Sequence, residues 1–354
     1  MPIETIAQSA PIASAIGPTP APRALSRWLF IIAALVFLMV VVGGITRLTE
    51  SGLSMVRWEP VSGIVPPLDY QQWQAEFTAY KAYPEYQKLN RGMSLQEFKN
   101  IFFWEYLHRL IARLIGLAFA VPLLWFAWTR VIPKGYGWKL TGLFALGGLQ
   151  GFIGWWMVAS GLIDRPDVSH LRLATHLSAA LIILAGLVWT GLDLAALAQN
   201  PAARPARYPP AVIPLTLILA IQIILGAFTA GLDAGYAFNT WPKMGGEWFP
   251  AGTPMLAPFW YNLIDNPVVV QFSHRTTAYL AVLAALFTAW IAARRGARSS
   301  AFELAGMVAI QFGLGIATIL SGVEIWVGVA HQAGAALLVI VTVRTAHRLG
   351  QRTA

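Results

Sequence analysis

The chain has 354 residues, 57 % hydrophobic and only 12 % charged, whereas soluble domains carry about 25 % charged residues, so it is predicted to be a polytopic membrane protein. Its net charge of +9 comes from Lys and Arg scattered near the ends of apolar segments, which argues against a nucleic-acid partner. The absence of cysteine excludes disulfides, thiolate catalysis, iron–sulfur clusters and thiolate-ligated heme.

The first 26 residues precede any long apolar segment. They are rich in Ala, Pro and Ser and contain no Lys or Arg before Arg23, so they match neither a signal peptide nor a transit peptide. We expect residues 1–26 to form a disordered cytoplasmic tail. The lack of a transit peptide favours a bacterial inner membrane.

Eight apolar segments follow, each long enough to cross a bilayer. They are predicted near residues 27–45, 106–129, 140–160, 171–197, 212–231, 268–293, 302–321 and 325–346. The connections on the side of the termini carry most of the Lys and Arg, whereas the long first loop on the other side, residues 47–104, offsets its basic residues with acidic ones. By the positive-inside rule, both termini are predicted to be cytoplasmic.

The two halves of the chain repeat each other, as the motif at residues 43–46 and its counterpart at 226–229 show. Further matches at equivalent spacing are His108-Arg109 with His274-Arg275, Gln150 with Gln311, Gly154 with Gly315, and His176 with His331. We therefore predict an all-α membrane protein whose eight helices form two four-helix bundles, residues 27–200 and 201–354, related by a pseudo-twofold axis along the membrane normal.

Each even-numbered segment carries one histidine in its outer third: His108, His176, His274 and His331. The second and fourth helices of an up-down bundle can face each other across its core, which suits two imidazoles that bind one iron from opposite sides. An alanine one turn after each histidine leaves room for a porphyrin edge. A histidine in a membrane segment can instead form only interhelical hydrogen bonds, but four at equivalent depth in repeat-related pairs favour heme ligation.

Other ionisable residues accompany these histidines. Glu105, one turn before His108, is a candidate acid–base group, or it merely stabilises the N-terminus of the second segment. His170 is expected to be solvated in an outer loop, and His347 to interact with a helix C-terminal dipole. Four arginines at the outer ends of segments are candidate partners of heme propionates: Arg47, Arg109, Arg172 and Arg275.

Five stretches resemble motifs of the heme A synthase family: GGITRLTESGLSMVRWEPVSGIVPP, EFKNIFFWEYLHRLIARLIG, HLRLATHLSAA, FSHRTTAYL and AHQAGAALL. The resemblance covers essentially the whole chain after the N-terminal tail. It implies an oxidoreductase that oxidises the C8 methyl of heme O stepwise, through an alcohol, to the formyl group of heme A for terminal oxidases. Some family members have a cysteine pair in the first outer loop; this chain resembles the cysteine-free proteobacterial and mitochondrial branch.

The resemblance also implies roles for individual residues. His274 and His331 would bind a heme b cofactor, His108 and His176 would flank the substrate heme, and Glu105 would be the catalytic residue. The implied partners are heme O, a heme O synthase (protoheme farnesyltransferase), the cytochrome oxidase assembly apparatus and an electron donor that the sequence does not identify.

When the family resemblance is set aside, the residues also fit two other functions. A diheme b-type cytochrome would transfer electrons without modifying heme. A transporter would use its histidines structurally, since internal repeats are frequent in transporters. Chemical analysis of the bound heme separates the enzyme from the cytochrome, and a missing Soret band would indicate the transporter.

Overall fold

The computed structural model describes residues 19–58, 62–163 and 166–351. In this part of the chain eight helices are long and apolar enough to cross a membrane, which confirms the all-α class and the eight predicted segments. They are α1 (Pro22–Leu48), α4 (Leu95–Trp128), α5 (Gly137–Gly161), α6 (His170–Gln199), α7 (Ile213–Gly231), α9 (Pro267–Arg294), α10 (Arg298–Leu320) and α11 (Ile325–Gly350). Shorter helices are α2 (Tyr70–Lys81), α3 (Pro84–Lys88) and α8 (Asn262–Asp265), with 3₁₀ turns η1 (Ser62–Ile64), η2 (Pro210–Val212), η3 (Ala234–Tyr236) and η4 (Phe259–Tyr261).

Two helices begin five or more residues earlier than the apolar pattern predicted. Helix α1 begins at Pro22, because the fixed φ of proline is favourable in the first turn of a helix. Residues 1–18 of the predicted tail lie outside the described residues. Helix α4 begins at Leu95 because Ser94 and Glu97 form a capping box, in which each side chain accepts a hydrogen bond from the other residue's backbone N–H. The end of the predicted loop at 47–104 is therefore helical, and Glu105 lies well inside α4.

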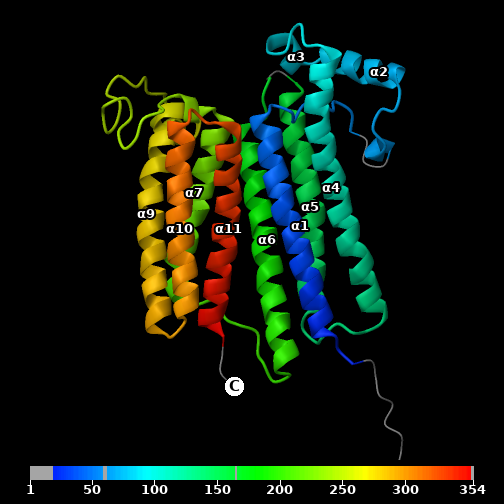
Figure 1. Ribbon diagram of the computed structural model, residues 1–354, viewed down its shortest axis with the longest axis vertical. Coiled ribbons are helices and arrows are strands. Elements are labelled where there is room, and N and C mark those ends of the chain that lie inside the picture. The colour runs from blue at the N-terminus through cyan, green and yellow to red at the C-terminus, as the bar shows by residue number, and fades with distance from the viewer. Residues whose placement is uncertain (1–18, 59–61, 164–165, 352–354) are drawn as a thin grey trace, which may run out of the picture.

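The long helices form two groups (Figure 1). In the first group α1 packs against α4 and α6, and α5 packs against α6; in the second, α9 packs against α7 and α10, and α10 against α11. The groups meet where α1 contacts α11 and where α6 contacts α7 and α11. Helices α2 and α3 cover one end of the first group, which we call the loop face; the start of α1 and the end of α11 lie at the opposite end, the termini face.

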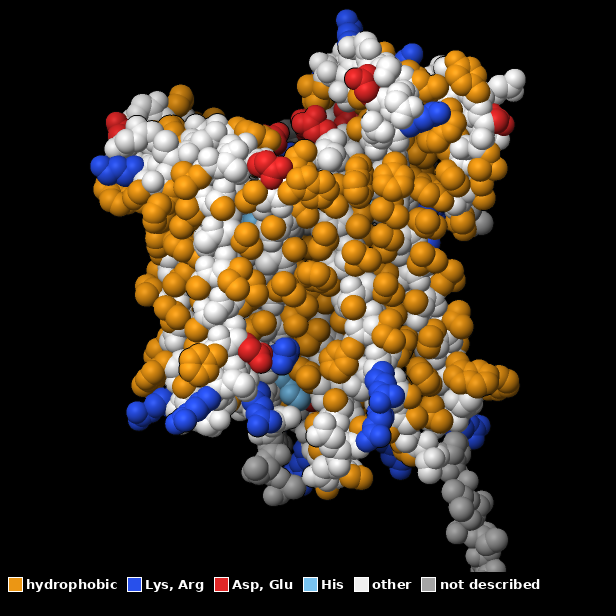
Figure 2. Space-filling model, in the orientation of Figure 1, with side chains coloured by type: hydrophobic (Ala, Val, Ile, Leu, Met, Phe, Trp, Pro, Cys, Tyr) orange, Lys and Arg blue, Asp and Glu red, His pale blue; other side chains and the backbone are white. Residues whose placement is uncertain are grey.

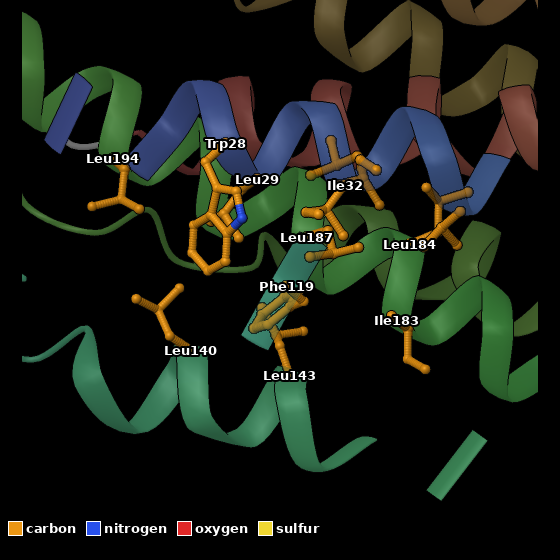
Figure 3. Close-up of a cluster of buried hydrophobic side chains, with 14 of the residues drawn as sticks. Trp28, Leu29, Ile32, Phe119, Leu140, Leu143, Ile183, Leu184, Leu187 and Leu194 are labelled. Carbon is orange, nitrogen blue, oxygen red and sulfur yellow. The ribbon is translucent and has the colours of Figure 1, made fainter. Parts of the chain in front are cut away.

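The core of the first group lies around α1 and α6 (Figure 3). Leu29 and Ile32 of α1 are buried together with Leu184 and Leu187 of α6. Trp28 is also buried, and its indole N–H donates to the carbonyl of Ala118 in α4 at 2.9 Å, so its polar atom is satisfied. In the second group the packed residues are mainly small, which lets membrane helices approach closely. They include Ala281, Ala285, Ala289 and Ala292 of α9 and Ala301 of α10.

A buried ionic cluster joins the two groups near the termini face. Asp193 of α6 lies 3.0 Å from Nε2 of His347 in α11 and 3.3 Å from Nζ of Lys139 in α5. The backbone N–H of Ala206, in the segment that connects the two groups, donates to the same carboxylate at 3.0 Å. His347 lies in the last turn of α11, as the predicted interaction with the helix dipole requires, but its side chain is also buried and bonded to Asp193, which the sequence did not predict.

His170 also differs from its predicted environment. It begins α6, is only 5 % exposed, and its Nε2 lies 3.3 Å from Oδ1 of Asp265. Its ring contacts Phe228 of α7 edge-on, with ring centres 5.5 Å apart. The solvated loop predicted for His170 is replaced by a contact between the two groups.

Substituting Asp193 should destabilise the fold strongly. Asp193→Ala leaves His347, Lys139 and a backbone N–H without their acceptor in a buried site, at a cost of about 3–5 kcal/mol in the free energy of unfolding. Thermal unfolding of the purified protein in detergent should show a clearly lower Tm. The matched control is Glu303→Ala, which breaks the exposed pair with Arg344 and should cost about 0–1 kcal/mol. Equal effects of the two substitutions would contradict this role of Asp193.

Candidate functional site

His274 of α9 and His331 of α11 face each other near the loop face. Their ring centres are 6.5 Å apart and their ring planes are at 85°. An iron bound by two imidazoles lies about 2 Å from each ligand nitrogen, which puts the two ring centres about 6 Å apart. The pair therefore has the separation needed to share one iron.

Glutamine side chains contact three of the four histidines. Nε2 of Gln311 lies 3.2 Å from Nδ1 of His331 and donates to that residue's carbonyl at 3.0 Å. Gln150 makes the same two contacts with His176, at 3.1 and 3.0 Å. An iron-bound imidazole carries a proton on its other nitrogen and needs an acceptor there. Rotation of the amide would present its oxygen, which is buried without a hydrogen-bond partner among the described residues, in exchange for the bond from Nε2 to the backbone carbonyl.

His108 is the histidine that has no glutamine partner. In the second half, Gln222 of α7 lies 3.1 Å from Nδ1 of His274 and is four residues before Gly226. The repeat-related position on α1, four residues before Gly43, is Met39, which has no amide to offer His108. The two halves therefore differ in how firmly they orient the first histidine of each pair.

Glycines make room for the imidazole rings. A Cβ atom added to Gly154, Gly226 or Gly315 would lie 3.0 Å from the ring of the facing histidine, and one added to Gly43 would lie 3.3 Å away. The facing pairs are Gly154 with His176, Gly226 with His274, Gly315 with His331 and Gly43 with His108. No group of three or more His, Asp or Glu side chains within the described ranges could hold a metal ion. Paired imidazoles in glycine-lined space suit an iron whose other ligands come from a porphyrin.

Glu105 is held by three donors. It is 3 % exposed; its Oε2 accepts from the hydroxyl of Ser54 at 2.7 Å and the N–H of Met55 at 2.6 Å, and its Oε1 lies 2.6 Å from Nη2 of Arg109. The alternative in which Glu105 stabilises the N-terminus of its helix is wrong, because α4 begins at Leu95 and a helix dipole acts within the first turn. The carboxylate is instead fixed against the loop that follows α1.

A second buried carboxyl lies in the layer above this site. Glu85 of α3 is 4 % exposed, and burial raises its pKa to about 8, with the negative charge of Glu105 adding to the shift. A carboxyl with that pKa carries a proton at neutral pH. Nothing in the sequence distinguishes Glu85 from the many other acidic residues of the first outer loop.

The arginines that follow His108 and His274 make equivalent contacts. Each donates two hydrogen bonds to backbone carbonyls of the loop that precedes its helix. The acceptors are Met55 and Arg57 for Arg109, at 2.8 and 3.1 Å, and Phe238 and Thr240 for Arg275, at 2.7 Å each. These acceptors are repeat-related. Met55 stands at the same spacing after Gly43 as Phe238 does after Gly226, and Arg57 and Thr240 correspond in the same way.

The other two candidate propionate partners are engaged differently. Arg172 donates to the carbonyl of Trp156 at 2.7 Å and stacks over its ring. Arg47 crosses to the second group, where it donates to the carbonyl of Ala230 at 2.8 Å and to Asp233 at 2.9 Å. Their role toward propionates stays a prediction.

The sequence did not identify several residues of this site. Gln222 was missed although it is the one strongly polar side chain in an otherwise apolar segment, a signal that usually marks function. Gln150 and Gln311 were recognised as repeat-related, but their contact with histidine was not predicted. Ser54 lies within the first quoted motif, but its contact with Glu105 was not predicted, because that contact depends on how the loop after α1 folds back.

The chain is similar to known proteins over almost its full length. Residues 26–343 match the family model described as cytochrome oxidase assembly protein. A protein of Rhizorhabdus wittichii named heme A synthase is 56 % identical over 338 residues, covering 96 % of this chain and 97 % of the relative. Heme A synthases of Sphingopyxis alaskensis (53 %, covering 97 and 96 %) and Rhodospirillum centenum (49 %, covering 93 and 89 %) are also similar.

Substitutions at two glycines of α10 test the space around His331. Gly315→Val places a Cβ 3.0 Å from the ring and adds two methyl groups, so it should displace the imidazole and lower the heme bound per protein. The matched control is Gly313→Val, because a Cβ at Gly313 meets nothing within 4 Å. Heme would be quantified after purification by the pyridine hemochrome method. Normal heme content in Gly315→Val would contradict the placement of the site.

Proposed function

The chain belongs to the cytochrome oxidase assembly protein family, and on that premise we propose that it is a heme A synthase, an oxidoreductase that converts heme O to heme A. The observation that carries this proposal is the 56 % identity, over almost the whole of both chains, to a relative named heme A synthase. The reaction oxidises the C8 methyl carbon of heme O stepwise, through an alcohol, to the formyl group of heme A. Its product would serve cytochrome oxidase assembly, and a heme O synthase would supply its substrate.

The two halves would divide the work between two hemes. His274 and His331 would hold a resident heme b, which supplies one-electron redox chemistry, and His108 and His176 would flank heme O. This division is supported by the acid in the first half: Glu105 lies one turn before His108, whereas no carboxylate precedes His274 at that spacing. Gln222 also supports this division, because it orients His274 in the second half, whereas the corresponding residue in the first half, Met39, has no amide to orient His108.

Glu105 would act on the substrate in the first half. Its position one turn before His108 puts it on the helix face that the substrate heme would contact. The carboxylate can accept a proton at Oε2, where the hydroxyl of Ser54 can pass the proton on, or it can stabilise positive charge that develops at the oxidised carbon. Arg109 and the N–H of Met55 keep the carboxylate in one orientation during these steps.

The protein would lie in a bacterial inner membrane with both termini in the cytoplasm and its heme sites toward the periplasm. Lys and Arg side chains gather at the termini face in Figure 2, as the positive-inside rule requires for a cytoplasmic face. The four candidate heme-binding histidines lie near the loop face, on the opposite side. We assign residues 27–200 and 201–354 to two bundles related by a pseudo-twofold axis, supported by the equivalent glycine, glutamine and arginine contacts in each half.

Substitution of Glu105 tests the proposed function. Glu105→Ala should retain its bound hemes but form heme A at least a hundredfold more slowly, because it removes the acid–base group and not an iron ligand. The protein would be expressed in a host that makes heme O, and extracted hemes would be separated by chromatography. The wild type should yield the hydroxylated product and heme A. Unaltered heme O from the wild type would indicate a diheme cytochrome instead, and normal product from Glu105→Ala would remove Glu105 from the mechanism.

A further inference from the structure

The two halves place residues of opposite hydrogen-bonding character at one repeat-related position. Glu105 and Gln271 each lie three residues before a histidine and are 3 % and 1 % exposed. Glu105 accepts a hydrogen bond from the backbone N–H of Met55. Gln271 instead donates from Nε2 to the carbonyl of Phe238 at 3.1 Å, and its Oε1 is buried without a partner among the described residues.

This difference changes the charge of the two sites. In the first half Arg109 and Glu105 form an ion pair at 2.6 Å, so their charges cancel. In the second half, within the described residues, Arg275 forms no ion pair with a carboxylate, and its buried Nε has no hydrogen-bond partner. The guanidinium of Arg275 therefore stands beside His274 as an uncompensated positive charge.

An uncompensated positive charge beside a heme has a defined effect. Reduction of the iron from Fe(III) to Fe(II) adds one electron and lowers the charge of the site by one, so a nearby cation stabilises the reduced form. Because the site is only partly exposed to solvent, this interaction is weakly screened.

We infer that Gln271 is a positioning residue which, by leaving Arg275 without a carboxylate partner, keeps the second half positively charged and raises the reduction potential of its resident heme. A glutamate at this position would pair with Arg275 as Glu105 pairs with Arg109, and would cancel the effect. The inference rests on the proposed function, since it takes the heme of the second half to be the resident one.

The test is a redox titration of purified full-length protein from a host that makes heme b but not heme O. Dithionite and ferricyanide supply and accept the electron, and the heme absorption bands report the reduced fraction. Gln271→Glu should lower the ratio of reduced to oxidised heme at a fixed potential about tenfold, which corresponds to about 59 mV for one electron. The matched control, Gln271→Met, removes the same hydrogen bond without adding charge and should change the ratio less than threefold.

An unchanged potential in Gln271→Glu, or an equal decrease in Gln271→Met, would overturn the inference. If Gln271→Glu binds no heme, Arg275→Gln provides the test instead. A heme reduction potential lower than that of the wild type supports the inference, and an unchanged potential contradicts it. A wild-type protein that binds no heme b would overturn the proposed function together with this inference. If the wild type binds heme b but neither substitution changes the reduction potential, the inference alone is overturned.

Discussion

A polar side chain in the apolar layer of a membrane must find a polar partner, and the arrangement of three of the four histidines follows from this constraint. Three of the imidazoles meet a glutamine amide on a neighbouring helix, and all four face a glycine that leaves space for the ring. These contacts fix the rings at the loop face, where two of them lie at the separation required to share one iron.

The two halves repeat these contacts, and their differences explain how one scaffold could hold two hemes with different fates. The first half has a carboxylate, Glu105, and lacks a glutamine beside His108. The second half has amides, Gln271 and Gln222, in both corresponding places. A site with an acid and a less firmly oriented histidine suits a heme that is altered and released. A site with neutral amides and an unpaired arginine suits a heme that stays and exchanges electrons.

Much of the fold could be predicted from the sequence, because hydrophobic segments and charge distribution in a membrane protein reflect single strong requirements. The starts of α1 and α4 could not be found from hydropathy, since Pro22 and the capping box at Ser94 act through local backbone geometry. The contacts of His170 and His347 were missed for another reason. Their partners, Asp265 and Asp193, are distant in sequence, and only the packing of the two groups brings each pair together.

The candidate site was predictable mainly where the internal repeat marked it, whereas Glu105, whose repeat-related residue is Gln271, was found as an ionisable residue one turn before His108. The four histidines and Arg109 and Arg275 occur at matching spacings, so the repeat identified them without any structure. Ser54 has no polar counterpart in the second half, where the repeat-related residue is Ala237, and Glu85 lies beyond the repeat-matched part of its loop. Their proximity to Glu105 depends on how this loop folds over α4.

The central claim is that His274 and His331 share one iron, and electron paramagnetic resonance of the oxidised protein tests it most directly. Because their ring planes are 85° apart, ligation by both imidazoles should give the highly anisotropic low-spin signal that perpendicular axial imidazoles produce. Protein loaded with heme b alone should show this signal, and His331→Ala should abolish it. A high-spin signal in the wild type, or a low-spin signal that persists in His331→Ala, would contradict the account.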